Sequence, residues 1–142
     1  MKLLAPLVLV FLVTAVSAGT QSVAVQGTLT CDGKPAAGVK VKLYDENSIT
    51  PDNKLAEGKT DARGVFTLQG SEKSVLTLKP KFNVYHRCHY NNPIPFCYQK
   101  FTVNIPSRYI TDGSIPQKTF DAGRFNLEAK YPGQSRDCVN LA

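Results

Sequence analysis

The strongest restriction on the fold of this chain is an alternation of apolar and polar residues in several short segments. Val23, Val25 and Leu29 alternate with polar or small residues. The same pattern returns in three further segments, at residues 39–44, 101–105 and 125–130. Because successive side chains of a strand point to opposite faces of a sheet, each segment can bury one face and leave the other in water. The pattern is typical of antiparallel sheets.

Shorter runs of strand length fill much of the remaining chain, at residues 55–59, 65–68, 75–78, 82–88 and 118–121. Turns such as Asp32-Gly33 and Asp112-Gly113 separate the runs, because glycine adopts positive φ and aspartate binds the backbone that follows it. About eight short strands at this spacing predict an all-β sandwich of two sheets in a single domain. The only helical turn that we expect lies at 107–110.

The N-terminus has the features of a secretory signal peptide. Lys2 is followed by the apolar run Leu3–Val13, and small residues lie where signal peptidase cleaves, at Val16-Ser17-Ala18. The run is too short for a transmembrane helix, which needs about 20 apolar residues. We therefore expect a cleaved signal peptide at 1–18, a secreted, extracellular domain at 19–142, and no transmembrane segment.

The mature chain contains four cysteines, at positions Cys31, Cys88, Cys97 and Cys138. In an oxidising compartment an even number predicts two disulfides, and the sequence leaves three pairings open. Zinc is the alternative, because His86 and His89 lie beside Cys88. However, the chain has no Cys-x-x-Cys motif, and the Cys/His spacing is not that of a known zinc module. We expect disulfides, no metal and no cofactor.

The charge of the chain restricts its partners. Loss of Lys2 with the signal peptide lowers the formal net charge from +6 to +5. The basic residues are spread along the chain rather than gathered in a run, so we expect no nucleic-acid partner. A modest excess of cations suits a soluble domain and also permits attraction to anionic membrane lipid or acidic polysaccharide.

Several ordered motifs across the mature chain resemble those of one known family. They are Gly27–Pro35, Gly38–Asp45, Leu55–Asp61 with Gly64–Phe66, Val84–Cys88, Cys97–Lys100, Ile105–Ile110 and Asp121–Gly123. Together they resemble the nematode transthyretin-like family over almost all of the mature chain. The resemblance implies a secreted transthyretin-like, two-sheet antiparallel β-sandwich of about 7–8 strands, commonly stapled by disulfides. It implies little about function, because a fold does not fix an activity.

The implied fold favours one pairing of the cysteines. Cys88 ends one strand and Cys97 begins the next, so that hairpin neighbours would bring these two residues into disulfide geometry. The remaining bridge would then join Cys31, at the end of the first strand, to Cys138 in the tail. We therefore expect the pairs Cys88–Cys97 and Cys31–Cys138.

The sequence argues against an enzyme. The transthyretin fold includes hydrolases of 5-hydroxyisourate, whose chemistry needs paired histidines, an arginine and a C-terminal Tyr-Arg-Gly-Ser element. This chain has no histidine before His86, and its tail lacks that element. A nucleophile elbow and a phosphate-binding loop are also missing. We expect no catalytic residues, and a hydrolase centred on His86 is the least favoured reading.

The leading prediction is a secreted, non-enzymatic binding module. Lys40, Lys42 and Tyr44 alternate on one face of a strand, and Lys100 lies on another strand that could be a neighbour. We expect these four residues to contact an extracellular ligand, either an anionic phospholipid such as phosphatidylserine or a cell-surface receptor. The competing interpretation is that the lysines only make the outer face soluble.

A carrier of a small apolar ligand is the alternative function. Its cavity would lie between the sheets or between subunits, since oligomers could form through exposed sheet edges. The aromatic residues that could line such a cavity are Phe82, Tyr85, Phe96, Tyr98 and Phe101. Aromatic residues at strand spacing more often form a simple core.

Overall fold

The computed structural model describes residues 19–47 and 53–139. The predicted signal peptide at 1–18 lies outside the described residues. The strands are β1 (Gly19–Cys31), β2 (Lys34–Pro35), β3 (Lys40–Asp45), β4 (Asn53–Lys59), β5 (Val65–Ser74), β6 (Pro80–His86), β7 (Tyr98–Asn104), β8 (Thr111–Asp112), β9 (Thr119–Asn126) and β10 (Ser135–Asp137). The predicted helical turn is confirmed as the 3-10 helix η1 (Ser107–Tyr109).

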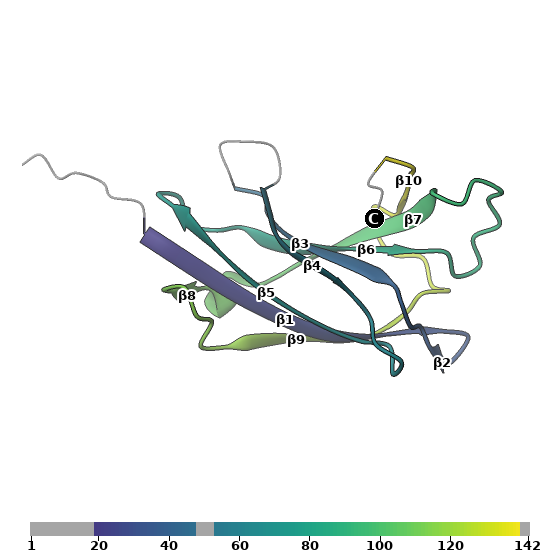
Figure 1. The fold of residues 1–142 in the computed structure, drawn as a ribbon, viewed down its shortest axis with the longest axis horizontal. Coiled ribbons are helices and arrows are strands. Elements are labelled where there is room, and N and C mark those ends of the chain that lie inside the picture. Colours follow the sequence, from purple (N-terminus) through teal and green to yellow (C-terminus); the bar gives the residue numbers. More distant parts are fainter. Residues whose placement is uncertain (1–18, 48–52, 140–142) are drawn as a thin grey trace, which may run out of the picture.

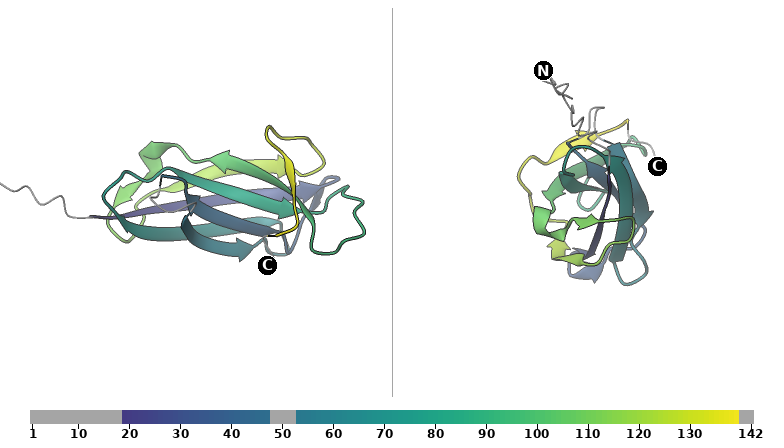
Figure 2. Two further views of the ribbon diagram at one scale, coloured as in Figure 1. Left: turned by 90° about the horizontal axis from the view of Figure 1, so that it is seen from above. Right: turned by 90° about the vertical axis from the view of Figure 1, so that its left-hand side faces the viewer.

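The strands form two sheets that pack face to face as an elongated sandwich (Figures 1 and 2). In the first sheet, β1 is central and pairs with β2, β5, β8 and β9. The second sheet has the order β10-β7-β6-β3-β4. Every described pair is antiparallel except β1 with β9, which is parallel. The predicted sandwich is therefore confirmed, with seven strands of six residues or more.

The core consists of side chains that point inward from the two sheets and pack against one another. Phe66 on β5 and Phe82 on β6 have ring centroids 5.3 Å apart, which joins the sheets directly. Phe125 on β9 contacts Phe82 and also Phe101 on β7. All of these rings except that of Phe125 are fully buried, so the alternation in the sequence marks the core correctly.

Two predicted strands differ from the structure for identifiable reasons. The segment 75–78 is not a strand, because its backbone groups form hydrogen bonds with the side chain of Gln21 instead of with a neighbouring strand. The Gln21 Nε2 donates to the Leu76 carbonyl at 2.8 Å, and the Gln21 Oε1 accepts from the Leu78 N–H at 2.9 Å. The segment 125–130 leaves the sheet after Asn126. Its partner strand β1 ends at Cys31, and the Ala129 N–H turns back to the Asn126 carbonyl.

The predicted cysteine pairing is wrong. The structure joins Cys31 to Cys88 and Cys97 to Cys138, with Cα–Cα distances of 5.9 and 4.1 Å. Continuing the β6–β7 register beyond its last pair, His86 with Gln99, would set Cys88 opposite Cys97. Continuing the β7–β10 register sets Cys138 opposite Cys97 in the same way. Because β7 has a neighbour on each side, Cys97 had two candidate partners, and the sequence prediction considered only one.

The two bridges have different structural roles. Cys31–Cys88 ties the end of β1 in the first sheet to the residues that follow β6 in the second sheet, so it links the two layers. Cys97–Cys138 holds the C-terminal strand β10 to the edge of the second sheet. Among the described residues, no helix is long and apolar enough to cross a membrane.

Candidate functional site

The four predicted binding residues lie on one outer surface, the exposed side of the second sheet. Lys40 on β3 pairs with Tyr85 on β6, and Tyr85 pairs with Lys100 on β7, so that these three residues form one row across the strands. Lys42 and Tyr44 follow on the same face of β3 at the period of two residues that separates like-facing side chains. The structure therefore brings together the residues that the sequence analysis selected.

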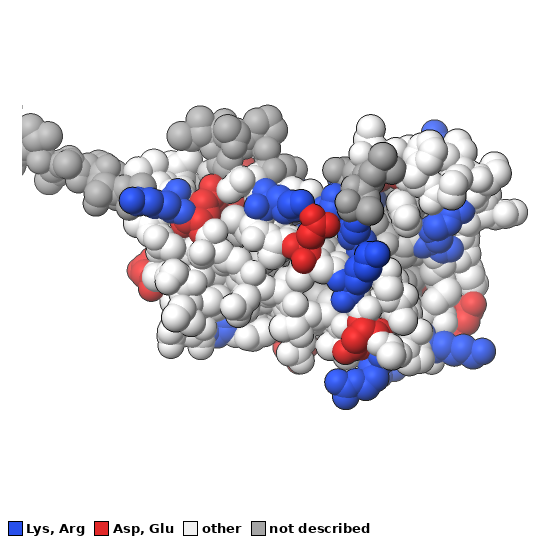
Figure 3. Space-filling view, in the orientation of Figure 1, with Lys and Arg blue, Asp and Glu red and all other residues white. Residues whose placement is uncertain are grey.

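More lysines share this surface, which we call the lysine face. Its lysines are Lys40, Lys42, Lys54, Lys59, Lys81 and Lys100, placed by the register of β3, β4, β6 and β7. Sequence reasoning missed Lys54, Lys59 and Lys81, because their relation to β3 depends on pairing between strands. Figure 3 shows lysine and arginine atoms as an interrupted band along the upper side of the view, with acidic atoms between them.

Two carboxylates neutralise part of the charge of the lysine face. Glu57 on β4 accepts from Lys54 and lies 3.9 Å from the Lys40 ammonium. These lysines lower the pKa of Glu57, chiefly through the hydrogen bond from Lys54. Asp137 on β10 lies 3.9 Å from the Lys100 ammonium. Among the described residues of this face, the lysines outnumber these two carboxylates, so the described part of the face is cationic.

Lys42 is the unusual member of the lysine face, because only 5% of the residue is exposed. Its ammonium lies 5.1 Å from the centroid of the Tyr85 ring, a cation–π contact. Burial lowers the pKa of Lys42, and attraction to Glu57 offsets this only in part. In the described part of the chain, no carboxylate oxygen lies within 4.0 Å of this ammonium. Lys42 therefore lies on the predicted face of β3 but is buried there, unlike an ordinary solvated surface lysine.

Polar side chains beneath the lysines form a hydrogen-bonded network. The Thr102 hydroxyl donates to the side-chain oxygen Oδ1 of Asn83 at 2.6 Å, and the side-chain nitrogen Nδ2 of Asn83 donates to the Tyr85 hydroxyl at 3.2 Å. Burial raises the pKa of Tyr85, so its hydroxyl keeps its proton throughout the physiological range. This network fixes the ring over which Lys42 lies.

The aromatic residues proposed for an apolar cavity do not share one. Phe82 and Phe101 are inside the packed core, whereas Tyr85 lies on the outer face in the row with Lys40 and Lys100. Tyr98 faces outward with Lys100, and Phe96 lies in the β6–β7 connection. An inter-sheet carrier site built from these residues therefore has no geometric support.

His86 is a core residue rather than an exposed acid–base group. It is 2% exposed, its ring packs against Phe101 with centroids 6.0 Å apart, and its Nδ1 accepts from the Cys88 N–H at 3.0 Å. Its Nε2 is buried without a hydrogen-bond partner. Burial lowers the pKa of His86 to about 4. A buried neutral imidazole cannot reach a substrate, and no carboxylate oxygen of the described residues lies within 4.0 Å of its ring nitrogens. The geometry therefore gives no support to a hydrolase at this position.

The buried His86 predicts acid sensitivity of the fold. The unfolded state takes up a proton near the usual histidine pKa of about 6.5, whereas the folded state does so only near its lowered pKa of about 4. Stability from this group is therefore complete above pH 6.5 and falls by about 3 kcal/mol on going down to pH 4. Urea unfolding between pH 7 and 4 measures the slope. His86→Leu should flatten it, and an unchanged slope in that variant would assign the acid sensitivity elsewhere.

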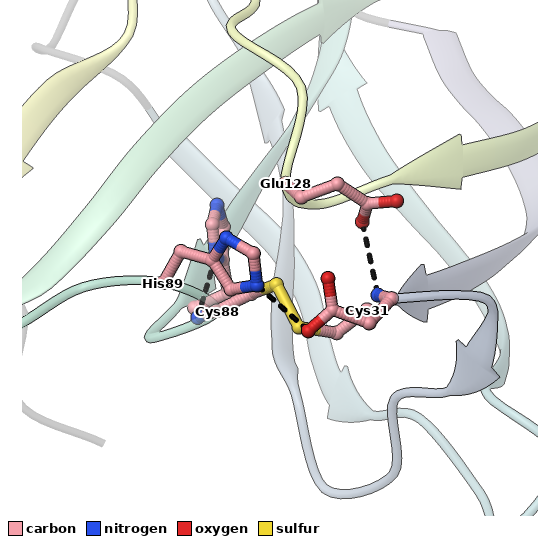
Figure 4. A network of polar contacts seen from close by, with 6 residues as sticks. Cys31, Cys88, His89 and Glu128 are labelled. Atoms are coloured by element: carbon pink, nitrogen blue, oxygen red, sulfur yellow. Dashed lines mark hydrogen bonds and ion pairs between the residues drawn. A yellow bond between two sulfur atoms is a disulfide. The ribbon is translucent and has the colours of Figure 1, made fainter.

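A second polar cluster surrounds the Cys31–Cys88 bridge (Figure 4); the sequence analysis named His89 beside Cys88 but missed Asp32 and Glu128 as members of the cluster. Asp32 and His89 directly follow the two bridged cysteines, and both have φ of 52°, a conformation that is uncommon outside glycine. The His89 Nε2 and Asp32 Oδ2 atoms are 2.7 Å apart, and the hydrogen bond to Asp32 raises the pKa of His89. The Asp32 N–H also donates to Glu128 at 3.3 Å.

This cluster is not a metal site in the oxidised protein. Donor atoms of Cys31, Cys88 and His89 lie within 4.8 Å of one another, but both sulfur atoms are joined in the disulfide. A thiolate, not a disulfide, is the sulfur ligand of zinc. An adjacent cavity of about 170 Å³, lined in part by His89, Glu128 and Lys130, is smaller than the range of about 300–1,000 Å³ that is typical of ligand pockets.

Fold and surface define a β-sandwich that is stapled by two disulfides and has a cationic outer face. The chain belongs to the transthyretin-like family: the sequence model of the family described as "Transthyretin-like family" matches residues 26–106, which is more than half of the chain. Transthyretin-like protein 5 of Caenorhabditis elegans is 44% identical over 141 residues, covering 99% of this chain and 100% of its own. Transthyretin-like protein 2 of the same organism is 46% identical over 127 residues, covering 85% of this chain and 84% of its own. The resemblance expected from the motifs is confirmed.

Proposed function

We propose that this protein is a secreted, non-enzymatic binding module whose lysine face recognises anionic phospholipid headgroups such as phosphatidylserine. The observation that carries the proposal is the desolvated ammonium of Lys42, which lies over the ring of Tyr85. Tyr85 in turn lies between Lys40 and Lys100 in one row of the sheet. Among the described residues, no carboxylate oxygen lies within 4.0 Å of the Lys42 ammonium, and a desolvated cation gains most when an anion approaches. The surrounding lysines supply attraction of about 1 kcal/mol each near an anionic surface.

Secretion is part of this proposal. The N-terminal sequence has the features of a signal peptide, and all four cysteines are paired in disulfides, which persist in oxidising compartments outside the cell. Phosphatidylserine or another anionic lipid on an outer membrane surface would then be accessible to the protein. Burial of His86, the residue on which the hydrolase reading was centred, supports binding rather than catalysis at that position.

The test is sedimentation of the oxidised protein 19–142 with vesicles of phosphatidylcholine, with and without phosphatidylserine. The double variant Lys40→Met and Lys100→Met keeps the apolar stems and removes two charges from one row of the lysine face. We expect affinity for phosphatidylserine vesicles to fall roughly 30-fold, at about 1 kcal/mol per lysine. The control is Lys73→Met, which removes an exposed lysine from β5 in the first sheet.

Two further comparisons make the result decisive. Vesicles of phosphatidylglycerol separate recognition of the serine headgroup from general attraction to negative charge. Repeating the measurement at about 0.15 M salt, where the Debye length is about 8 Å, removes long-range attraction. An equal loss in Lys73→Met and the double variant would contradict a site on the lysine face, and no binding to any anionic vesicle would contradict lipid recognition.

A further inference from the structure

Four consecutive apolar residues are exposed in the connection between β6 and β7. They are Pro93, Ile94, Pro95 and Phe96, which we call the apolar tip. Ile94 is 41% exposed and Phe96 is 48% exposed. The β6–β7 connection protrudes from the right-hand end of the sandwich in Figure 1. A run of exposed apolar residues works against solubility unless it serves an interaction.

The connection that carries the apolar tip is cross-linked at its base. Cys88 and Cys97 lie on either side of the tip, and each is anchored to a different part of the fold by its own disulfide. The Arg87 guanidinium lies beneath the loop and donates to the carbonyls of Asn92, Ile94 and Cys97. One charged side chain thus satisfies three backbone acceptors of the loop.

Further contacts inside the loop fix its shape. The Asn92 carboxamide oxygen accepts from the Ile94 N–H at 2.9 Å, and its amide donates to the Tyr90 hydroxyl at 2.9 Å. The Arg87 guanidinium also lies 5.5 Å from the centroid of the Tyr90 ring. The polar groups therefore bond inside the loop, while the side chains of Ile94 and Phe96 stay exposed. A preformed apolar tip binds without the entropic cost of ordering a flexible loop.

The apolar tip is close in the fold to the lysine face. The last rung between β6 and β7 pairs His86 with Gln99, and the next rung pairs Tyr85 with Lys100 in the row that includes Lys40. Lys100, the lysine of this face that is nearest along β7 to the loop, is therefore only one residue pair away from the last β6–β7 pair. Apolar residues beside a cationic surface match the membrane interface, where acyl chains lie beneath anionic headgroups.

We propose that the apolar tip inserts into the acyl-chain boundary of the anionic membrane that the lysine face contacts. This inference rests on the proposed function and adds a second, salt-resistant component to it. The lysines would supply attraction that weakens with salt, and Ile94 and Phe96 would supply burial of apolar area that does not. A protein partner for the tip is the competing outcome that the experiment must separate.

The chain contains no tryptophan, so one introduced indole reports on its own surroundings. Phe96→Trp places it on the apolar tip. Ile115→Trp is the matched control, since Ile115 is 70% exposed in the connection between β8 and β9, at the opposite end of the sandwich. On adding phosphatidylserine vesicles, we expect the emission of Phe96→Trp to shift to shorter wavelength and to be quenched by brominated acyl chains. The control should show neither change.

A second variant measures the contribution of the tip without a probe. Phe96→Ser should lower the affinity for phosphatidylserine vesicles by about tenfold or more at physiological salt, because a large apolar side chain no longer becomes buried. Vesicle binding should also become more sensitive to salt. The Ile115→Ser control should bind as the unmodified protein does.

The outcomes separate the insertion from the proposed function. Sedimentation with phosphatidylserine vesicles without a change in Phe96→Trp emission would overturn the insertion and leave the lysine face intact. A spectral change that is equal with neutral and anionic vesicles would support insertion and overturn headgroup recognition. Absence of both signals with every vesicle would overturn both, and would direct the search for a partner of the tip to proteins.

Discussion

Replacing Cys31 and Cys88 together by serine should lower the free energy of unfolding by about 4 kcal/mol. The bridge closes a loop with a sequence separation of 57 residues, and in the chain-entropy model a loop of this size loses about that much when it is opened. The bridge also links the two sheets, so its loss removes a constraint between layers that otherwise rest on side-chain packing. Urea unfolding of the oxidised protein and the double variant measures the difference.

The choice of partners gives this prediction an internal control. Replacing Cys88 and Cys97, which are not partners, breaks both bridges at once, so we expect about twice the loss of stability and a poorly folded protein. Replacing Cys31 and Cys88 breaks only one bridge. If the variant that lacks Cys88 and Cys97 were the more stable of the two, the pairing in the structure would be incorrect.

Peptide mapping tests the same pairing without any substitution. Cleavage after Tyr90 separates Cys88 from Cys97, and trypsin releases the peptides that contain Cys31 and Cys138. Under non-reducing conditions, the peptide with Cys88 should remain attached to the one with Cys31. Recovery of Cys88 attached to Cys97 would restore the pairing expected from the hairpin and contradict the structure.

The parts of the fold that could be predicted are those encoded by local patterns. Val23, Val25 and Leu29 are all buried on β1, as their alternation indicates, and Lys40 and Lys42 point to the opposite side of the sheet from Val41. These features depend only on the two-residue period of a strand. The same period placed the candidate lysines on one face before any strand pairing was known.

The parts that could not be predicted depend on contacts distant in sequence. The choice between Cys88 and Cys138 as the partner of Cys97 required the order of strands around β7. Burial of Lys42 required its position over Tyr85, which comes from the neighbouring strand β6. The strand predicted at 75–78 failed because Gln21 bonds its backbone from another part of the chain. No local pattern contains this information.

The apolar tip shows a different limit of sequence reasoning. The sequence pattern places Phe96 among the aromatic residues that could line an apolar cavity or form a simple core, and both interpretations predict a buried ring. Its exposure follows from Arg87, which bonds three carbonyls of the loop, and from the two bridges at Cys88 and Cys97. Arg87 and the two disulfides thus hold the loop in a conformation that leaves Phe96 exposed, and this exposure is the basis of the role proposed for the apolar tip.

Phe82→Ala should lower the free energy of unfolding by about 3–5 kcal/mol, the usual cost of removing a phenyl ring from a packed core. Phe82 is fully buried on β6 and contacts Phe66 and Phe125, which both come from the opposite sheet. Its loss would leave a cavity at the centre of the interface between the sheets. Urea unfolding at neutral pH measures the change.

Phe96→Ala is the matched control, because it removes the same ring from the apolar tip rather than from the core. Since Phe96 is 48% exposed, we expect a change in stability within about 0.5 kcal/mol. The two variants should then affect different properties: Phe82→Ala lowers the free energy of unfolding, whereas Phe96→Ala lowers only the affinity for vesicles. A comparable loss of stability in Phe96→Ala would mean that its ring supports the loop, and the argument that the tip is held outward for binding would lose its basis.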